Sequence, residues 1–141
     1  MPWIAESDMS LPIPGFRKAS DGPQFNPVSK WLQRIDQAAV IDPQLTSAQM
    51  KIAESKAEEL TRAGFKYGLI NLGGTYVSVL KHDLSHHSFL HRESAMHCGH
   101  FVRVCLKVAG IDPWGEKVCD ENTAPELIYQ QFPPVAEWHK N

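Results

Sequence analysis

The chain has 141 residues, of which 43% are hydrophobic and 21% charged, and this length predicts one globular domain spanning residues 1–141. Fourteen Lys and Arg residues against sixteen Asp and Glu residues give a net charge of −2, which argues against a nucleic-acid binder. The most apolar stretch, 69–80, is shorter than a bilayer requires, and the N-terminus turns acidic at Glu6. We therefore expect no membrane span and no secretory signal, and a cytoplasmic or assembly-associated protein of otherwise unknown location.

The first part of the chain is predicted to hold extended segments and one long helix. Six of the ten prolines lie in the first 45 residues, which favours extended segments and turns there. A short helix is predicted over 27–35, where Asn26 can cap it, and a short strand over 38–41. A long helix is predicted over 47–63, because residues 46–49 offer a capping box and Gly64 can end the helix.

The second part of the chain is predicted to hold three further helices. The apolar run 69–80 suits a helix better than a buried strand, although Gly73 and Gly74 weaken both alternatives. The polar stretch 82–97 indicates a loop. Residues 98–109 predict a helix with Cys98, Phe101, Val102, Cys105 and Ala109 on one face, and residues 123–126 form a second capping box before a helix ending near 130.

Cysteine usage indicates free thiols, because the three cysteines are few, odd in number and without a Cys-x-x-Cys pair. Cys98 falls in the first turn of its predicted helix, where unpaired N–H groups and the helix dipole favour an anion. We therefore expect its thiol to ionise readily, as in thiol hydrolases. The alternative is that Cys98 is a small apolar residue packed beside Phe101 and Val102.

Six of the seven histidines fall within residues 82–100. The pairs His82 with His86 and His87 with His91 have the spacing that places two imidazoles on one helical face, as in some zinc sites. The glutamate that follows the first histidine in such sites is missing, and the surrounding serines suit a solvated loop. We therefore expect no metal and no cofactor, with metal analysis and changes at His86 and His87 as the test of the alternative.

Four segments occur in an order that resembles a known family. Residues 3–8 resemble a strand bearing a glutamate, 63–68 a helix leading into a glycine-tyrosine turn, 98–110 a nucleophile helix, and 122–127 a following threonine-proline helix. The series resembles the circularly permuted papain-like cysteine amidases and peptidases, which are permuted relatives of bacterial cell-wall peptidases. The resemblance spans roughly residues 3–130.

The family resemblance implies a role for particular residues. A histidine on an early strand acts as general base there, a polar residue on the next strand orients it, and a later cysteine attacks an amide or ester carbonyl. By position, Cys98 matches the nucleophile and Glu6 the orienting residue. The first histidine of this chain is His82, so the early histidine of the family has no counterpart and the general base stays unassigned.

Three alternatives follow from the missing histidine. The chain is a non-catalytic module that has lost a strand, or another chain supplies that strand, or a histidine of residues 82–100 acts as the base. The first two imply a protein partner, because a removed strand leaves a sheet edge open. The same feature is what a chain incomplete at its N-terminus would show.

We thus predict an α+β fold with a papain-like permuted core, in which three or four helices pack on a small antiparallel sheet. The predicted function is that of a thiol hydrolase acting on a peptide amide, with peptidoglycan as the substrate that the resemblance implies. The alternative is an inactive papain-like module that serves as a structural or binding component of a larger assembly such as a phage particle.

Overall fold

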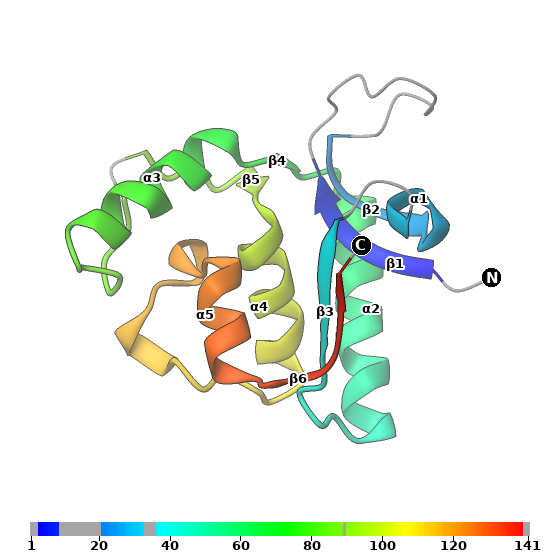
Figure 1. Cartoon of the computed structure of the whole chain (residues 1–141). Coiled ribbons are helices and arrows are strands. Elements are labelled where there is room, and N and C mark those ends of the chain that lie inside the picture. Colours follow the sequence, from blue (N-terminus) through cyan, green and yellow to red (C-terminus); the bar gives the residue numbers. More distant parts are fainter. Residues whose placement is uncertain (1–2, 9–20, 33–35, 89, 140–141) are drawn as a thin grey trace.

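The computed structural model describes residues 3–8, 21–32, 36–88 and 90–139, and it confirms the mixed α+β class (Figure 1). Helices and strands alternate irregularly along the chain. In chain order they are β1 (Trp3–Asp8), β2 (Gly22–Pro27), α1 (Ser29–Leu32), β3 (Gln37–Ile41), α2 (Ser47–Ala63), β4 (Lys66–Tyr67), α3 (Leu69–Leu80), β5 (Ala95–Met96), α4 (Cys98–Val108), the 3-10 turns η1 (Gly115–Lys117) and η2 (Asp120–Asn122), α5 (Pro125–Gln131) and β6 (Pro134–His139).

The strands of the described residues form three two-stranded sheets rather than one. β1 pairs antiparallel with β2, and β3 pairs antiparallel with β6. β4 and β5 form a short parallel pair, with Lys66 opposite Ala95 and Tyr67 opposite Met96. The parallel pair matters for the site, because it brings the residues after α2 beside those that precede α4.

Helix α2 has the bounds predicted from the sequence. The Thr46 side chain accepts a hydrogen bond from the backbone N–H of Gln49, and the Gln49 side chain accepts one from the Thr46 N–H, which completes the capping box. Gly64 ends the helix with φ of 71°, a left-handed conformation that glycine adopts without steric cost. The predicted helix over 69–80 is also confirmed, as α3.

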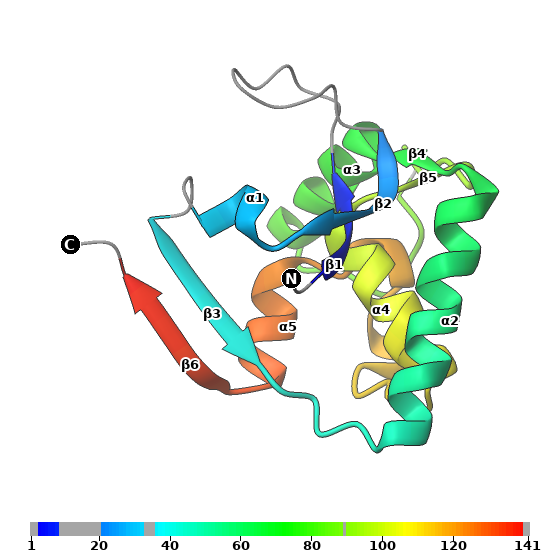
Figure 2. The same cartoon turned by 90° about the vertical axis from the view of Figure 1, so that its right-hand side faces the viewer.

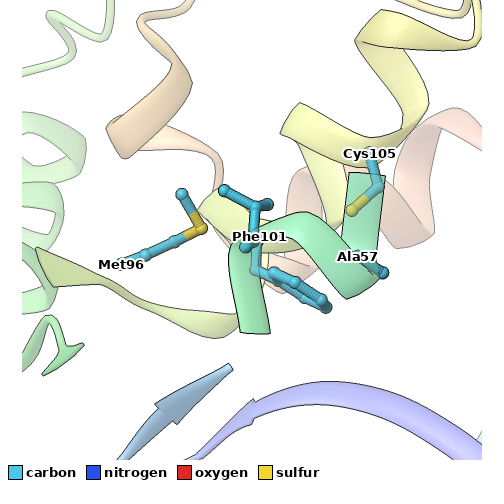
Figure 3. Packing of buried hydrophobic residues seen from close by; sticks show 5 residues of the cluster. Ala57, Met96, Phe101 and Cys105 are labelled. Carbon is cyan, nitrogen blue, oxygen red and sulfur yellow. The ribbon is translucent and has the colours of Figure 1, made fainter. Parts of the chain in front are cut away.

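Helix α4 lies at the centre of the fold, between α2 and α5 (Figures 1 and 2). Its residues Phe101 and Cys105 are buried against Ala57 and Leu60 of α2 and against Met96 of β5, and Figure 3 shows this packing. The predicted helix over 98–109 is therefore confirmed, ending one residue earlier.

The predicted apolar face of α4 needs one correction. Val102 was expected on the buried face, but it is 36% exposed, whereas Arg103 is completely buried. The Arg103 guanidinium donates to and pairs with oxygen atoms of the segment that follows α4, which compensates the burial of its charge. These contacts are hydrogen bonds to the carbonyl oxygens of Gly115 and Val118 and to the Thr123 hydroxyl, and ion pairs with Asp112 and Asp120.

The second capping box was predicted wrongly. Helix α5 begins at Pro125 with Ala124 as its N-cap, and no side chain caps it. Thr123 is buried and its hydroxyl accepts a hydrogen bond from Arg103 instead, at 3.2 Å. The Thr123 hydroxyl therefore binds Arg103, a residue distant in the sequence, instead of capping α5 as the local pattern predicted.

The predicted helix over 27–35 also differs from the structure. Pro27 belongs to strand β2, where it lies opposite Trp3, and α1 covers only Ser29–Leu32. Pairing with β1 explains the later start, because it keeps the chain extended as far as Pro27. Residues 33–35 lie outside the described part.

The ribbon of β3 and β6 projects from the rest of the fold (Figure 2). The strand predicted over 38–41 is confirmed, although it starts one residue earlier, while its partner β6 was not predicted. Both strands are mostly exposed, including Val40, Val135 and Trp138.

The predicted loop over 82–97 is largely confirmed, since its one element in the described residues is the two-residue strand β5. None of the helices in the described residues has the length and apolar character that a bilayer span requires.

Candidate functional site

Cys98 is the first residue of α4 and directly follows the parallel pair of β4 and β5. Its side chain is neither buried nor fully exposed. The first N–H groups of an α-helix lack partners within the helix, and the helix dipole adds positive potential there. Cys98 therefore stands where a thiolate, or an oxyanion formed beside it, is stabilised by the backbone.

Tyr67 lies beside this thiol. Burial raises the pKa of Tyr67, and the nearby Cys98 sulfur and the Asp8 carboxylate raise it further. The phenol is therefore neutral at physiological pH, and it can donate a hydrogen bond to a thiolate. The sequence analysis did not select Tyr67, although it belongs to the glycine-tyrosine turn of residues 63–68 that carried the family resemblance.

His97 caps α4 and is not presented to the neighbouring Cys98. It is fully buried, its Nδ1 accepts a hydrogen bond from the N–H of His100 at 3.4 Å, and its Nε2 lies 2.6 Å from the carbonyl oxygen of Glu121. With Nδ1 accepting, Nε2 carries the proton and donates it to that carbonyl. Burial lowers the pKa of His97, so its ring is neutral and serves as a structural link between α4 and η2.

Glu6 is held by side chains that follow β1 in the chain. Its Oε1 accepts from Asn26 at 2.6 Å and from Lys30 at 3.0 Å, while its Oε2 accepts from the Trp31 indole at 2.6 Å. The same Lys30 ammonium forms an ion pair with Asp8 at 3.0 Å. Glu6 therefore fixes α1 against strands β1 and β2.

Successive side chains of β1 point to opposite faces of the strand, so Ser7 points away from the side that Glu6 occupies. Ser7 is buried, and its hydroxyl donates to the carbonyl oxygen of Met96 at 2.7 Å, two residues before Cys98. Among the described residues no hydrogen bond or ion pair joins Glu6 to Cys98. The predicted role of Glu6 in orienting a base therefore stays a prediction, and Ser7 is the β1 residue that supports the segment leading to the thiol.

Histidines of the loop gather around Glu121 rather than around Cys98. The Nδ1 atoms of His87 and His91 lie 2.5 and 3.7 Å from Glu121 Oε1, and the two rings are 5.2 Å apart. Burial, with a contribution from His97, lowers the pKa of His100 to about 4, so this ring is uncharged near neutral pH. No histidine of the described residues is hydrogen-bonded to the Cys98 sulfur, and the general base stays unassigned.

The other two cysteines differ from Cys98. Cys105 is buried in the core, and burial raises the pKa of its thiol to about 11. Burial and the nearby carboxylates of Glu121 and Asp120 raise the pKa of the Cys119 thiol. All three cysteines are free, as the sequence indicated, so Cys105 and Cys119 serve as internal comparisons for the reactivity of Cys98.

An apolar groove runs along α3 near this site. Its volume is about 540 Å³, and its lining includes Leu72, Thr75, Tyr76 and Val79, all from α3. The Thr75 hydroxyl lies 3.3 Å from His97 Nε2, which places one end of the groove near the start of α4.

Comparison with models of protein families, with curated proteins and with solved structures finds no significant match to this chain.

Proposed function

We propose that this protein is a cysteine-type amidase or peptidase of the permuted papain-like kind, with Cys98 as its nucleophile. The observation that carries the proposal is the setting of Cys98, which is partly exposed at the start of α4 and lies beside the neutral Tyr67 hydroxyl. A thiol in this setting is favoured as a nucleophile because a helix N-terminus and a hydroxyl donor both stabilise negative charge on sulfur.

The reaction that this arrangement supports is acyl transfer. The Cys98 sulfur attacks the carbonyl carbon of an amide, and the thiol proton passes to a base. The free N–H groups at the start of α4 stabilise the resulting oxyanion. The amine leaves with a proton as the tetrahedral intermediate collapses to a thioester, and water then releases the acid and regenerates the thiol.

The substrate class comes from the family resemblance and not from the site itself. A peptide amide of peptidoglycan is the substrate that the resemblance implies, and the groove along α3 provides an apolar surface for the acyl side. Within this proposal Glu6 positions the base through the β1 strand, and the base comes from a histidine of residues 82–100 or from a partner chain.

The second candidate function is an inactive module of the same fold in a larger assembly such as a phage particle. The specific observation in its favour is that both nitrogens of His97 are occupied and that the rings of His87 and His91 face Glu121. The exposed ribbon of β3 and β6 supports it too, because an isolated two-stranded ribbon is only marginally stable in water and gains from a covering partner.

The reactivity of the three thiols tests the nucleophile directly. The native protein is alkylated with iodoacetamide across pH 5 to 9, and the modified peptides are quantified by mass spectrometry. We expect Cys98 to react first, and to react at a pH at which Cys105 and Cys119 stay unmodified, since the pKa values of those two thiols are raised.

The variant Tyr67→Phe refines this test, because it removes the hydroxyl while keeping the ring. We expect Cys98 to be alkylated more slowly at a fixed pH in this variant, with Cys105 unchanged. If Cys98 reacts no faster than Cys119 in the wild-type protein, the hydrolase proposal is wrong. The inactive module is then the better explanation.

A further inference from the structure

The histidine-rich loop is held firmly against the segment 119–122. The backbone N–H of Cys119 donates to the Leu84 carbonyl oxygen at 2.7 Å, and the Cys119 sulfur donates to the Ser85 carbonyl oxygen at 3.1 Å. The Asn122 amide donates to the carbonyl oxygens of Leu84 and His86, at 3.1 and 2.9 Å. These bonds fix the relative positions of side chains that lie far apart in the sequence.

Glu121 lies at the centre of this contact with its carboxylate 98% buried. Among the described residues its ion-pair partners are the imidazoles of His87 and His91, and no lysine or arginine neutralises it. Burying a carboxylate is costly unless a positive charge compensates it. A neutral imidazole offers a hydrogen bond but no charge, whereas a bound cation supplies positive charge directly.

The donor atoms of His87, Cys119 and Glu121 lie within 4.8 Å of one another. In a tetrahedral zinc site the ligand atoms are about 3.5 Å apart, because Zn–N and Zn–S bonds measure roughly 2.0 to 2.3 Å. Binding therefore needs side-chain rotations that bring the more distant donors together and move His87 Nδ1 and Glu121 Oε1 apart. His91 Nδ1 and Glu121 Oε1 are 3.7 Å apart, which is already close to the separation of two ligand atoms in a zinc site.

An independent observation concerns His91. Its Nδ1 atom is buried and has no hydrogen-bond partner among the described residues, although it faces the Glu121 carboxylate. Unsatisfied buried nitrogen atoms are rare in proteins because they lose the free energy of hydration without compensation. A metal ion between His91 and Glu121 removes this deficit.

We propose that His87, His91, Cys119 and Glu121 bind a Zn²⁺ ion that ties the histidine-rich loop to η2. Two imidazoles, a thiolate and a carboxylate form a donor set that zinc favours, and four protein ligands make the site structural. On binding, the Cys119 thiol releases its proton to solvent, gives up its bond to the Ser85 carbonyl and forms the Zn–S bond.

The proposed ion also bears on the start of α4. The backbone carbonyl of Glu121 accepts the hydrogen bond from His97, the N-cap residue that precedes Cys98. Fixing Glu121 therefore fixes the N-terminus of α4. The zinc site does not depend on the proposed hydrolase activity, and an inactive module would bind the ion equally.

Metal binding by the full chain, purified without a histidine tag and stripped with a chelator, tests the proposal. We expect one Zn²⁺ per chain and a higher melting temperature with Zn²⁺ than without it. With Co²⁺ in place of Zn²⁺, we expect the ultraviolet charge-transfer band of a cobalt thiolate. Cys119→Ser should abolish that band and weaken Zn²⁺ binding more than about tenfold.

The control variants are His86→Ala and Cys98→Ser, which change a histidine and a thiol outside the proposed ligand set. His86 is 81% exposed and contacts Asp83 and Ser85, so its loss should leave Zn²⁺ affinity unchanged. The proposal is overturned if the wild-type protein gives no cobalt-thiolate band. It is equally overturned if Cys98→Ser, rather than Cys119→Ser, removes the band.

Discussion

Replacing the buried Arg103 with methionine is expected to lower the free energy of unfolding by about 3 to 5 kcal/mol. The arginine has no exposed surface and joins α4 to the segment that follows it. Methionine fills part of the volume but removes the donor from the Asp112 carboxylate and from the carbonyl oxygens of Gly115 and Val118, whereas Asp120 keeps its ion pair with Lys107. Urea unfolding, followed by circular dichroism, measures the loss.

Two further variants separate the buried network from charge alone. Arg103→Lys keeps the charge but cannot reach several oxygens at once, so it should remain clearly destabilised. Arg62→Met removes an exposed partner of Glu58 in α2 and should change stability by less than about 1 kcal/mol. A stabilising role of the buried Arg103 contacts is ruled out if Arg103→Met is as stable as Arg62→Met.

Gly99→Ala is expected to be the second strongly destabilising change, because a Cβ atom at residue 99 would lie 1.9 Å from the Thr123 carbonyl oxygen. Backbone atoms stand on both sides of this contact, so α4 and the 122–124 segment must move apart. We expect a loss of at least about 2 kcal/mol in unfolding free energy and slower alkylation of the adjacent Cys98.

Gly73→Ala is the matched control, since no atom lies within 4 Å of the position that its Cβ would take. This residue is exposed inside α3, where alanine favours the helix by about 1 kcal/mol over glycine. We expect this variant to be as stable as the wild type or more stable. Equal stability of Gly99→Ala and Gly73→Ala would contradict the close packing of α4 against residue 123.

The local features of the fold were predictable because each depends on neighbouring residues. The capping box at Thr46 and the glycine at position 64 were enough to place both ends of α2. The pattern of Phe101 and Cys105 was likewise enough to place α4. The free cysteines also followed from their number and spacing.

The remaining features depend on contacts between distant residues. Thr123 looked like a helix cap, but Arg103 takes its hydroxyl, and no local pattern reports that competition. The pairing of residues 37–41 with 134–139 joins segments that lie about a hundred residues apart in the sequence. The meeting of His87 and His91 with Glu121 depends on how the loop folds back, so the sequence spacing alone favoured a solvated loop.

For the candidate site, the sequence identified Cys98 and its position at a helix start. It did not identify Tyr67 as a neighbour of the thiol, since β4 and β5 pair only in the folded chain. Nor did it indicate that Glu6 would bind Asn26, Lys30 and Trp31. These contacts hold the Glu6 carboxylate against α1.

Hydrolysis of a peptidoglycan-derived peptide tests the central claim that Cys98 performs amide cleavage. Wild-type protein and Cys98→Ala are incubated with the peptide, and new amino groups and fragment masses are followed over time. We predict cleavage of one amide bond by the wild type and a rate at least about a thousandfold lower in Cys98→Ala. Equal rates in the two proteins, or no cleavage by folded wild type whose Cys98 is alkylated rapidly, would contradict the hydrolase account.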